Sequence, residues 1–303
     1  MFNDVYFTLN ENRIEKLYDV ADVKNGFNYW FYKLLNICIS MFDYGNLPPM
    51  LPQREIELNL ILTNHCVVFQ DEKNQLITAN TNIYGMDVYY NPTEATYANP
   101  NLRYKKLNIG MNCEIIYNNN LKDNISYIPS DGSLKSFIFR YARMLADIES
   151  TINIYTVNAR LTSYPVATND KVANSIKTFF NKIKSGKNAV ISDDAIIESF
   201  RNVDVNRNHI NDSINDWLVA RDKVLEMFYR DIGVKMYNPK RAQVNEDELA
   251  VNDQLLLISK EDMLRERQEG VERINNMFGT SIDVKINDRF NIEFSQLNNE
   301  GGK

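Results

Sequence analysis

The two histidines and three cysteines are the side chains through which this chain can hold a transition metal or activate a nucleophile. His65 and Cys66 are neighbours, whereas His209, Cys38 and Cys113 stand far from them. A structural zinc site uses four ligands, usually two pairs at short spacing, and there is no second pair. A Ser-His-Asp triad would need one of the histidines, and neither lies in a supporting motif. We expect no metal site and no catalytic residue here; His65 is a predicted strand neighbour and His209 a solvated residue before a helix.

Three acidic clusters are the remaining candidates for enzymatic chemistry, because grouped carboxylates can bind Mg²⁺ for nucleic-acid cleavage. They are Asp193-Asp194, Glu246-Asp247-Glu248 and Glu261-Asp262. Two of them coincide with predicted helix starts, where carboxylates stabilise the helix dipole. The sequence contains no phosphate-binding motif of the GxxxxGK[ST] or GxGxxG type. Helix capping is therefore the favoured interpretation of these clusters.

Basic residues gather in three segments that are candidate phosphate contacts. These segments contain Lys184 and Lys187, then Arg201 and Arg207, and finally Lys235, Lys240 and Arg241. Each segment alone is typical of a solvated surface, and a chain with a net charge of -6 does not attract a polyanion as a whole. If the chain forms a ring, one cation per subunit gives a ring of positive charge. Such a ring can contact DNA phosphates without recognising the base sequence. Any DNA contact should therefore be local and non-specific.

The length and composition indicate a folded protein. Its 303 residues allow one large domain or two to three small ones. A hydrophobic share of 44%, with 17 Tyr and 15 Phe, is in the ordinary globular range. No apolar run reaches roughly 18 residues, and residues 1–12 lack a signal-peptide pattern, so we expect neither a membrane span nor secretion. The odd, widely spaced cysteines favour a reducing compartment, the cytoplasm.

Hydrophobic periodicity predicts long helices. Apolar residues from Phe27 to Phe42 recur every three or four positions, and Gly26 predicts a break between this helix and a weaker one upstream. A second helix is predicted from Ser133 to about Asn158, with a length on the order of 40 Å. A third should begin at residues 211–213 and end at Gly233. A helix about 40 Å long is longer than a small domain needs to cover its own core.

The segments between these helices predict a β-rich module and a small insertion. Within residues 54–118, the spacing of Ile56, Leu58, Leu60 and Leu62 and the runs 66–69, 86–90 and 113–117 predict strands. Residues 160–205 predict one short helix and a strand at 189–192. From Gly233 to Ile258 we predict a flexible loop, followed by a helix from Ser259 to Gly279 and a strand at 282–286. The fold class is α+β.

Four motifs occur in fixed order between residues 30 and 287. They are Met41–Pro49, which ends in Asn46-Leu47-Pro48-Pro49; Ile115–Asn119; Val244–Asp253, which contains Glu246, Asp247, Glu248, Asn252 and Asp253; and Arg273–Lys285. With the order of elements, these motifs resemble the portal family, and specifically the upper collar, or head-tail connector, proteins of small short-tailed phages with protein-primed genomes.

This resemblance implies a portal fold with long stem helices, a β-rich wing module and a small α/β clip. The implied divisions are 1–128 wing, first part; 129–159 stem helix; 160–207 clip; 208–232 second stem helix; 233–249 channel loop; 250–290 wing, second part; and 291–303 flexible tail. The family's channel lysine falls on Arg201, and Lys235, Lys240 and Arg241 lie in the implied channel loop. Lys184, Lys187 and Arg207 are the implied clip contacts.

The resemblance also implies a non-enzymatic ring, a dodecamer, at the portal vertex of the virion, assembled in the host cytoplasm. Implied partners are double-stranded DNA, the major capsid protein and scaffold, lower collar and tail proteins, and the packaging ATPase, with no cofactor and no direct membrane contact. Relatives can carry a basic N-terminal arm for the packaging motor's RNA, but residues 1–12 contain no Lys or Arg. Two alternatives stay open: a metal-dependent nuclease, and a scaffold protein that forms no ring.

Overall fold

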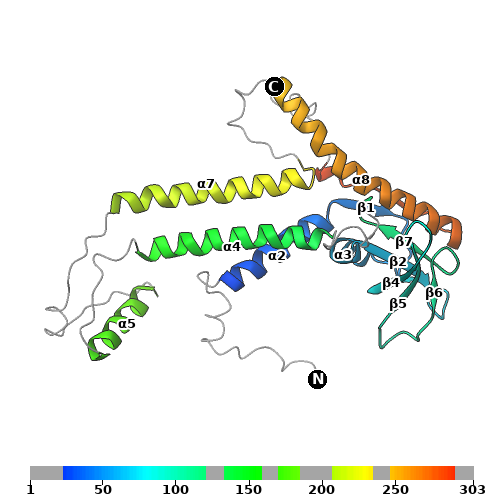
Figure 1. Cartoon of the computed structure of the whole chain (residues 1–303), viewed down its shortest axis with the longest axis horizontal. Coiled ribbons are helices and arrows are strands. Elements are labelled where there is room, and N and C mark those ends of the chain that lie inside the picture. Colours follow the sequence, from blue (N-terminus) through cyan, green and yellow to red (C-terminus); the bar gives the residue numbers. More distant parts are fainter. Residues whose placement is uncertain (1–22, 121–132, 159–169, 185–206, 235–245, 291–303) are drawn as a thin grey trace. The chain divides into compact units, whose positions relative to one another are not determined.

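The computed structural model describes residues 23–120, 133–158, 170–184, 207–234 and 246–290 (Figure 1). Helices and strands are mixed, in agreement with the α+β class. The chain divides into two compact units: a β unit, residues 31–141 and 225–303, and a helical unit, residues 1–30 and 142–224. Three helices have residues in both units: α2 (Val23–Ile39), α4 (Leu134–Asn158) and α7 (Arg207–Asp231).

Two three-stranded antiparallel sheets form the centre of the β unit. The first has the order β3-β2-β7, with β2 at His65–Gln70, β3 at Leu76–Thr78 and β7 at Cys113–Tyr117; the second has the order β4-β5-β6, with β4 at Thr81–Met86, β5 at Pro92–Tyr97 and β6 at Leu107–Asn108. Apolar side chains from both sheets share one core, in which the rings of Phe69 and Tyr97 stack at 4.9 Å. The predicted strands at 66–69 and 113–117 are confirmed.

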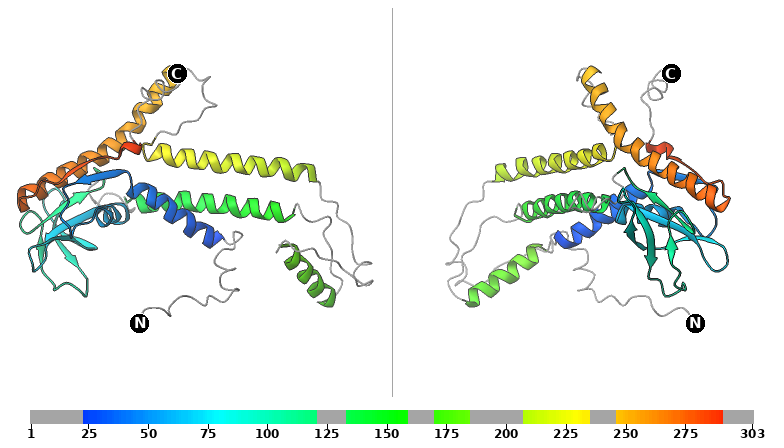
Figure 2. Two further views of the ribbon diagram at one scale, coloured as in Figure 1. Left: turned by 180° about the vertical axis from the view of Figure 1, so that it is seen from behind. Right: turned by 45° about the vertical axis from the view of Figure 1, so that its right-hand side comes forward.

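The strands β2 and β7 are buried on both faces, which explains their largely apolar sequences. One face meets the second sheet, and the other is covered by α3 (Gln53–Thr63) and α8 (Glu246–Phe278) (Figure 2). A Cβ at Gly270 would lie 2.9 Å from the Cα of Ile116, so glycine lets α8 lie directly on β7. This close contact fixes the C-terminal helix against the sheet.

The strand predicted from Ile56, Leu58, Leu60 and Leu62 is wrong, because this segment is α3. The side chains it buries are Ile56, Glu57, Leu60 and Ile61, which is helical spacing. The helix starts after Pro52 and stops at Asn64, which has φ 66°. The apolar residues within 58–62 fit both the two-residue period of a strand and the 3.6-residue period of a helix. Packing of this segment against β2 favours the helix.

The first predicted helix also ends earlier than expected. Helix α2 stops at Ile39, and Phe42–Gly45 forms β1, paired antiparallel with β8 (Asp283–Ile286). A Cβ at Gly45 would overlap the Asp283 carboxylate, so a larger residue there would displace that side chain. The predicted strand at 282–286 is confirmed, whereas Phe42 belongs to a strand and not to the helical stripe.

The predicted strand at 86–90 is wrong beyond Met86. Residues Asp87 to Asn91 form the turn of the β4–β5 hairpin, in which the Asp87 amide donates to the Asn91 carbonyl at 3.0 Å. Carboxylate oxygen Oδ1 of Asp87 also accepts the amides of Tyr89 and Asn91. An Asp that accepts main-chain amides two residues ahead favours a turn over an extended strand.

The long helices keep their predicted ends more closely than their predicted starts. Helix α4 matches the prediction, and α7 ends at Asp231, two residues before Gly233 (φ 77°), where the Val234 amide donates to Tyr229 O at 2.8 Å. Its start is Arg207, four residues before the expected one. The predicted loop to Ile258 is wrong from Glu246 onward, since α8 begins there, so Ser259 is inside that helix.

The helical unit contains α5 (Asp170–Lys184), which confirms the short helix of the insertion, and parts of α2, α4 and α7. Helix α2 runs through Gly26 without the expected break, and a Cβ there would lie 3.3 Å from that of Ala146 in α4. Gly26 thus permits close helix packing. The upstream helix, the strand at 189–192 and the tail 291–303 lie outside the described residues. Over the described ranges, each helix is too short or too polar to cross a membrane.

Candidate functional site

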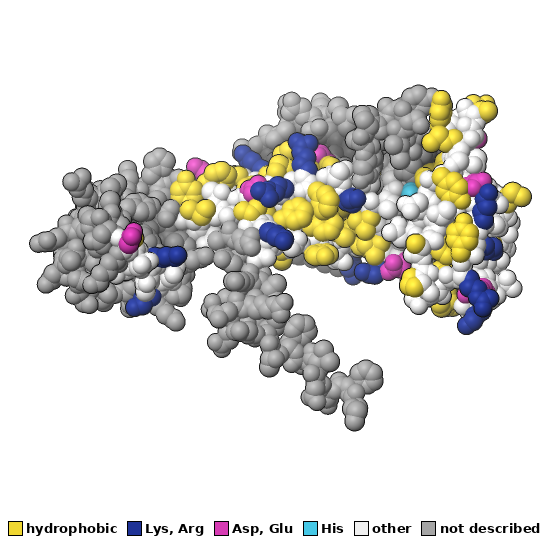
Figure 3. All heavy atoms as spheres, turned by 60° about the horizontal axis from the view of Figure 1, so that its bottom comes forward, with side chains coloured by type: hydrophobic (Ala, Val, Ile, Leu, Met, Phe, Trp, Pro, Cys, Tyr) yellow, Lys and Arg dark blue, Asp and Glu magenta, His cyan; other side chains and the backbone are white. Residues whose placement is uncertain are grey.

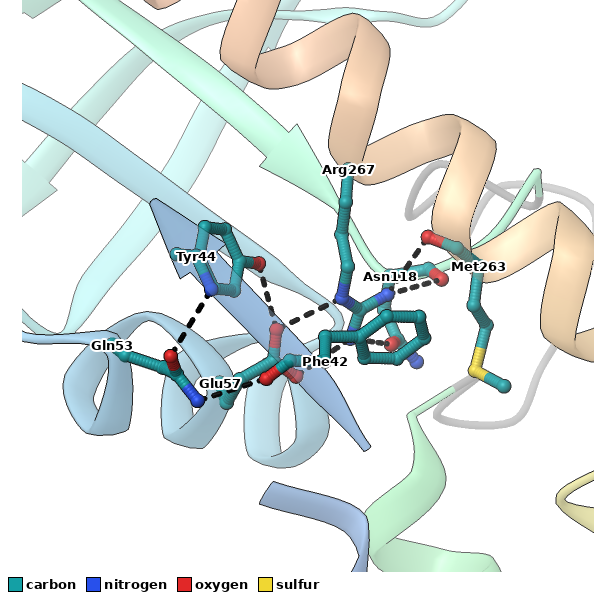
Figure 4. A network of polar contacts seen from close by, with 7 residues as sticks. All are labelled: Phe42, Tyr44, Gln53, Glu57, Asn118, Met263 and Arg267. Carbon is teal, nitrogen blue, oxygen red and sulfur yellow. Dashed lines mark hydrogen bonds and ion pairs between the residues drawn. The ribbon is translucent and has the colours of Figure 1, made fainter. Parts of the chain in front are cut away.

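A buried ion pair joins α3 and α8 in the β unit (Figure 4). The Arg267 guanidinium donates from Nε to Glu57 Oε1 at 2.9 Å and from Nη2 to Glu57 Oε2 at 2.8 Å. The two side chains are only 1% and 0% exposed. This paired geometry is the strongest that arginine and a carboxylate form.

The remaining polar atoms of this pair are occupied by neighbours. Arg267 also donates to the Met263 carbonyl at 3.0 Å and to Asn118 Oδ1 at 3.0 Å, and its guanidinium lies 4.0 Å from the centre of the Phe42 ring. The Tyr44 hydroxyl donates to Glu57 Oε1 at 2.7 Å. A buried charge is tolerated when each of its polar atoms has a hydrogen-bond partner. Removing one member of the pair would leave the other charge uncompensated in the low-dielectric interior.

Burial and the charges of the network raise the pKa values of Arg267, Tyr44 and two neighbouring thiols. Burial lowers the pKa of Arg267, but the charge and hydrogen bonds of Glu57 outweigh it and raise the pKa above its usual value. Burial, and then the Glu57 charge, hold the pKa of Tyr44 well above its usual range. Burial likewise raises the pKa of the nearby Cys38 and Cys66 thiols to about 12. These raised pKa values keep the Tyr44 hydroxyl and the two thiols protonated at neutral pH, which is the state in which Tyr44 donates to Glu57.

The network joins four segments that lie far apart in the sequence: β1, α3, the end of β7 and α8. Gln53 adds two bonds to β1, donating to the Phe42 carbonyl at 2.8 Å and accepting the Tyr44 amide at 3.2 Å. Sequence reasoning missed the network because Glu57 and Arg267 resemble ordinary surface charges. The available signal was the position of Glu57 between Ile56 and Leu60 on the buried face of a helix.

The histidine and cysteine neighbours are engaged in local packing. His65 lies in β2 as predicted, with Nε2 3.1 Å from the Thr81 carbonyl, and Cys66 Sγ is 3.1 Å from Thr78 Oγ1. His209 lies inside α7 and not before it, because the helix starts earlier than expected. Within the part of the chain that the structure describes, no three His, Cys, Asp or Glu side chains are grouped to hold a metal.

The acidic clusters have different positions. Glu261 and Asp262 lie inside α8, so their expected place at a helix start is wrong; Asp262 binds Asn120 and Arg265. Glu246, Asp247 and Glu248 are the first three residues of that helix, and Asp193-Asp194 lies outside the described residues.

The predicted DNA contacts are not brought together by the described part of the structure. Lys187, Arg201, Lys235, Lys240 and Arg241 lie outside the described residues. Lys184 is the last residue of α5 and Arg207 the first of α7. Of the motif residues, Glu246 to Asp253 belong to α8.

The Asn46–Pro49 motif forms the connection between β1 and α3. Asn46 has φ 55°, a left-handed conformation that asparagine tolerates, and its side-chain amide donates to the Ser281 carbonyl at 3.1 Å. The Leu51 amide then donates to the Pro48 carbonyl at 3.0 Å, and Leu51 is buried. The motif therefore ties this connection to the strand that follows α8.

The described residues form an α+β fold whose buried charges join distant parts of the chain. The family described as Phage Connector (GP10) matches residues 6–291. The chain belongs to this family and is a phage portal, or head-tail connector, protein, a structural component of the virion. The predicted resemblance is thereby confirmed. Among solved structures, the chain is similar to one from the "Portal and tail of native bacteriophage P68", with 15% identity, a TM-score of 0.48, and coverage of 98% of this chain and 95% of that one.

Proposed function

We propose that twelve copies of this chain form a ring at the genome-packaging vertex, and that double-stranded DNA enters and leaves the capsid through it. The observation that carries the proposal is the connector-family match over residues 6–291. The fold is compatible with this role, since α4 and α7 have 25 residues each and are on the order of 40 Å long. Helices of this length can line a channel.

In this proposal, residues 129–159 and 208–232 are the stem, 160–207 the clip, 233–249 the channel loop, and 1–128 with 250–290 the wing. Contacts in the β unit support a paired stem: Phe137 at the start of α4 stacks on Phe228 near the end of α7, with ring centres 5.8 Å apart. The Tyr141 hydroxyl also donates to the Asp231 carboxylate at 2.5 Å. Exposed apolar side chains on α4 and α7, such as Ile154 and Val219, would be covered by neighbouring subunits.

Arg201, Lys235, Lys240 and Arg241 are the proposed DNA contacts of the channel. Lys184, Lys187 and Arg207 are the proposed contacts of the clip. A channel in which DNA slides must hold phosphate weakly, because many cations per turn would give strong, salt-dependent retention. Sparse basic collars on a chain of net charge -6 meet this requirement.

The proposed ring is also a docking platform. On one side it would contact the major capsid protein and scaffold, and on the other the packaging ATPase and later the lower collar and tail proteins. It would assemble in the host cytoplasm, without a cofactor, catalytic activity or membrane contact. The ring itself does not hydrolyse ATP in this proposal, so the motor's work is supplied by the ATPase.

Electron microscopy of the purified protein in negative stain tests the ring. We expect closed rings with a central hole, and light scattering should report a mass of about 420 kDa for twelve copies of a 35.3 kDa chain. Monomers, dimers or solid particles at micromolar concentration would contradict the proposal and favour a scaffold protein that forms no ring.

Removing two proposed channel cations should change DNA retention while leaving assembly intact. Lys240→Ala with Arg241→Ala is expected to release packaged DNA at lower salt, because each lost phosphate contact reduces the salt-dependent affinity. The measurement is DNA retained by filled heads over a salt series. A matched control, Arg54→Ala with Lys73→Ala, removes two exposed cations outside the proposed channel. Identical retention curves for both double variants would argue against these contacts.

A further inference from the structure

Two asparagine side chains inside the β unit each carry a polar atom that needs a further partner. On the face of the molecule drawn in Figure 3, Lys, Arg, Asp and Glu side chains lie at the surface, where solvent can bind their polar atoms. Asn64 and Asn118, by contrast, are only 2% and 0% exposed. Among the residues that the structure describes, none forms a hydrogen bond with Asn64 Oδ1 or with Asn118 Nδ2. Buried polar atoms almost always have a partner, so these two atoms point to a bound group.

The two asparagines lie opposite each other, where the β2–β7 pairing reaches the end of α3. His65 is aligned with Tyr117, and the Asn118 amide donates to the Asn64 carbonyl at 2.9 Å, so the same register continues by one residue. Side chains opposite each other in an antiparallel pair have Cβ atoms about 4.5 to 5.5 Å apart. One small group can bridge two side-chain amides at such a separation.

Arg267 determines which atom of Asn118 needs a partner. Asn118 Oδ1 accepts a hydrogen bond from Arg267 Nη2 at 3.0 Å (Figure 4). The reverse orientation of the amide would direct its NH₂ group at the guanidinium, which has donors and no acceptor. Nδ2 is therefore the atom that needs a partner, and it can only donate.

Asn64 supplies the complementary atom. This residue ends α3 with φ 66°, and its Nδ2 donates to Asn119 Oδ1 across a long 3.5 Å. The amide oxygen of Asn64 is then the atom that needs a donor. If this amide were reversed, its oxygen would meet the Asn119 oxygen, and two acceptors form no hydrogen bond. The site thus combines one donor with one acceptor.

The chemistry of this pair of atoms selects water over an ion. A cation cannot accept from Asn118 Nδ2 and would be repelled by the nearby Arg267 charge, whereas an anion cannot donate to Asn64 Oδ1. Glu57 already compensates Arg267 at 2.8 Å, so the site has no net charge that attracts an ion. Water both donates and accepts, and buried water molecules typically bind polar groups that the protein itself leaves unsatisfied.

We propose that one buried water molecule bridges Asn64 Oδ1 and Asn118 Nδ2. The water donates to Asn64 and accepts from Asn118, which extends the Glu57–Arg267 network from β7 to the end of α3. The site does not depend on the proposed ring, because all of these residues belong to the β unit of one chain.

A structure of the intact chain at a resolution that shows ordered water tests the site directly, whether or not the chain forms rings. We expect density at about 2.7 to 3.2 Å from both Asn64 Oδ1 and Asn118 Nδ2. Three results would overturn the proposal: no density between these atoms, a direct hydrogen bond between the two side-chain amides, or density that anomalous scattering assigns to an ion.

Two glycine variants measure what the bridge contributes to stability. Asn64→Gly removes Oδ1 and keeps a backbone conformation, φ 66°, that glycine adopts readily. Asn74→Gly is the matched control, because Asn74 is also left-handed, with φ 57°, but is exposed in the turn between β2 and β3. The two changes affect the unfolded chain alike, so the difference between them reports the loss of the Asn64 side chain.

Thermal unfolding at one fixed protein concentration gives this difference. We expect a midpoint for Asn64→Gly that is lower than that of Asn74→Gly by about 3 °C or more. Equal midpoints would count against the bridge. If Asn64→Gly does not fold, the density in the wild-type structure decides the question.

Discussion

Arg267→Met should lower the free energy of unfolding by about 3 to 5 kcal/mol, because it leaves the Glu57 carboxylate buried without its counter-charge. The change also removes the bonds to Asn118 and the Met263 carbonyl, so the joint between β7 and α8 is expected to loosen with it. Urea denaturation at a fixed protein concentration measures the effect, since ring formation makes apparent stability depend on concentration.

Arg265→Met is the matched control for this prediction. Arg265 is on the same helix and pairs with Asp262, but its side chain is 53% exposed, so its loss should cost less than about 1 kcal/mol. Combining Arg267→Met with Glu57→Leu should recover part of the lost stability, since an apolar pair can replace a buried ion pair. Equal losses for the two arginine variants would show that the buried pair has no special role.

The second large effect is expected where α4 and α7 meet in the β unit. Phe228 is fully buried and contacts the rings of Phe137 and Tyr141 at 5.8 and 5.5 Å. Phe228→Ala should therefore cost about 3 to 5 kcal/mol, because it removes a buried aromatic ring and leaves a cavity. The proposed stem would lose its packing at this junction, so we also expect fewer closed rings by electron microscopy.

Met227→Ala controls for truncation at the neighbouring position of the same helix. Met227 is 41% exposed, and its loss should cost less than about 1 kcal/mol in urea denaturation. If the two alanine variants unfolded at the same urea concentration, the aromatic cluster would not be what holds these helix ends together.

Several features of the fold follow from local sequence. The apolar runs of β2 and β7 predicted strands correctly because both faces of these strands are buried. Helix ends at Gly233 and Gly279 were found because only glycine adopts their left-handed conformation without strain, with φ 77° and 67°. The connector family was recognised from short motifs that the family match over residues 6–291 confirms.

Other elements depend on contacts that no local pattern records. The run Leu58–Leu62 fits a strand or a helix, and α3 is selected by packing against β2. Phe42 continues the helical spacing of α2, yet pairing with Ile286, 244 residues later, makes it a strand residue. The segment before Ser259 was predicted to be a loop because it follows a polar, mixed-charge stretch with no clear period, so α8 was predicted thirteen residues too short.

The sequence by itself therefore determined the class, the family and the elements whose signals lie within a few residues of each other. Tertiary structure alone decided the Glu57–Arg267 pair. Residues 57 and 267 are 210 positions apart, and their charges become stable in the interior only because folding brings them within 2.8 Å and removes water. Local propensity acts over one or two turns of chain, whereas burial depends on which distant segments meet.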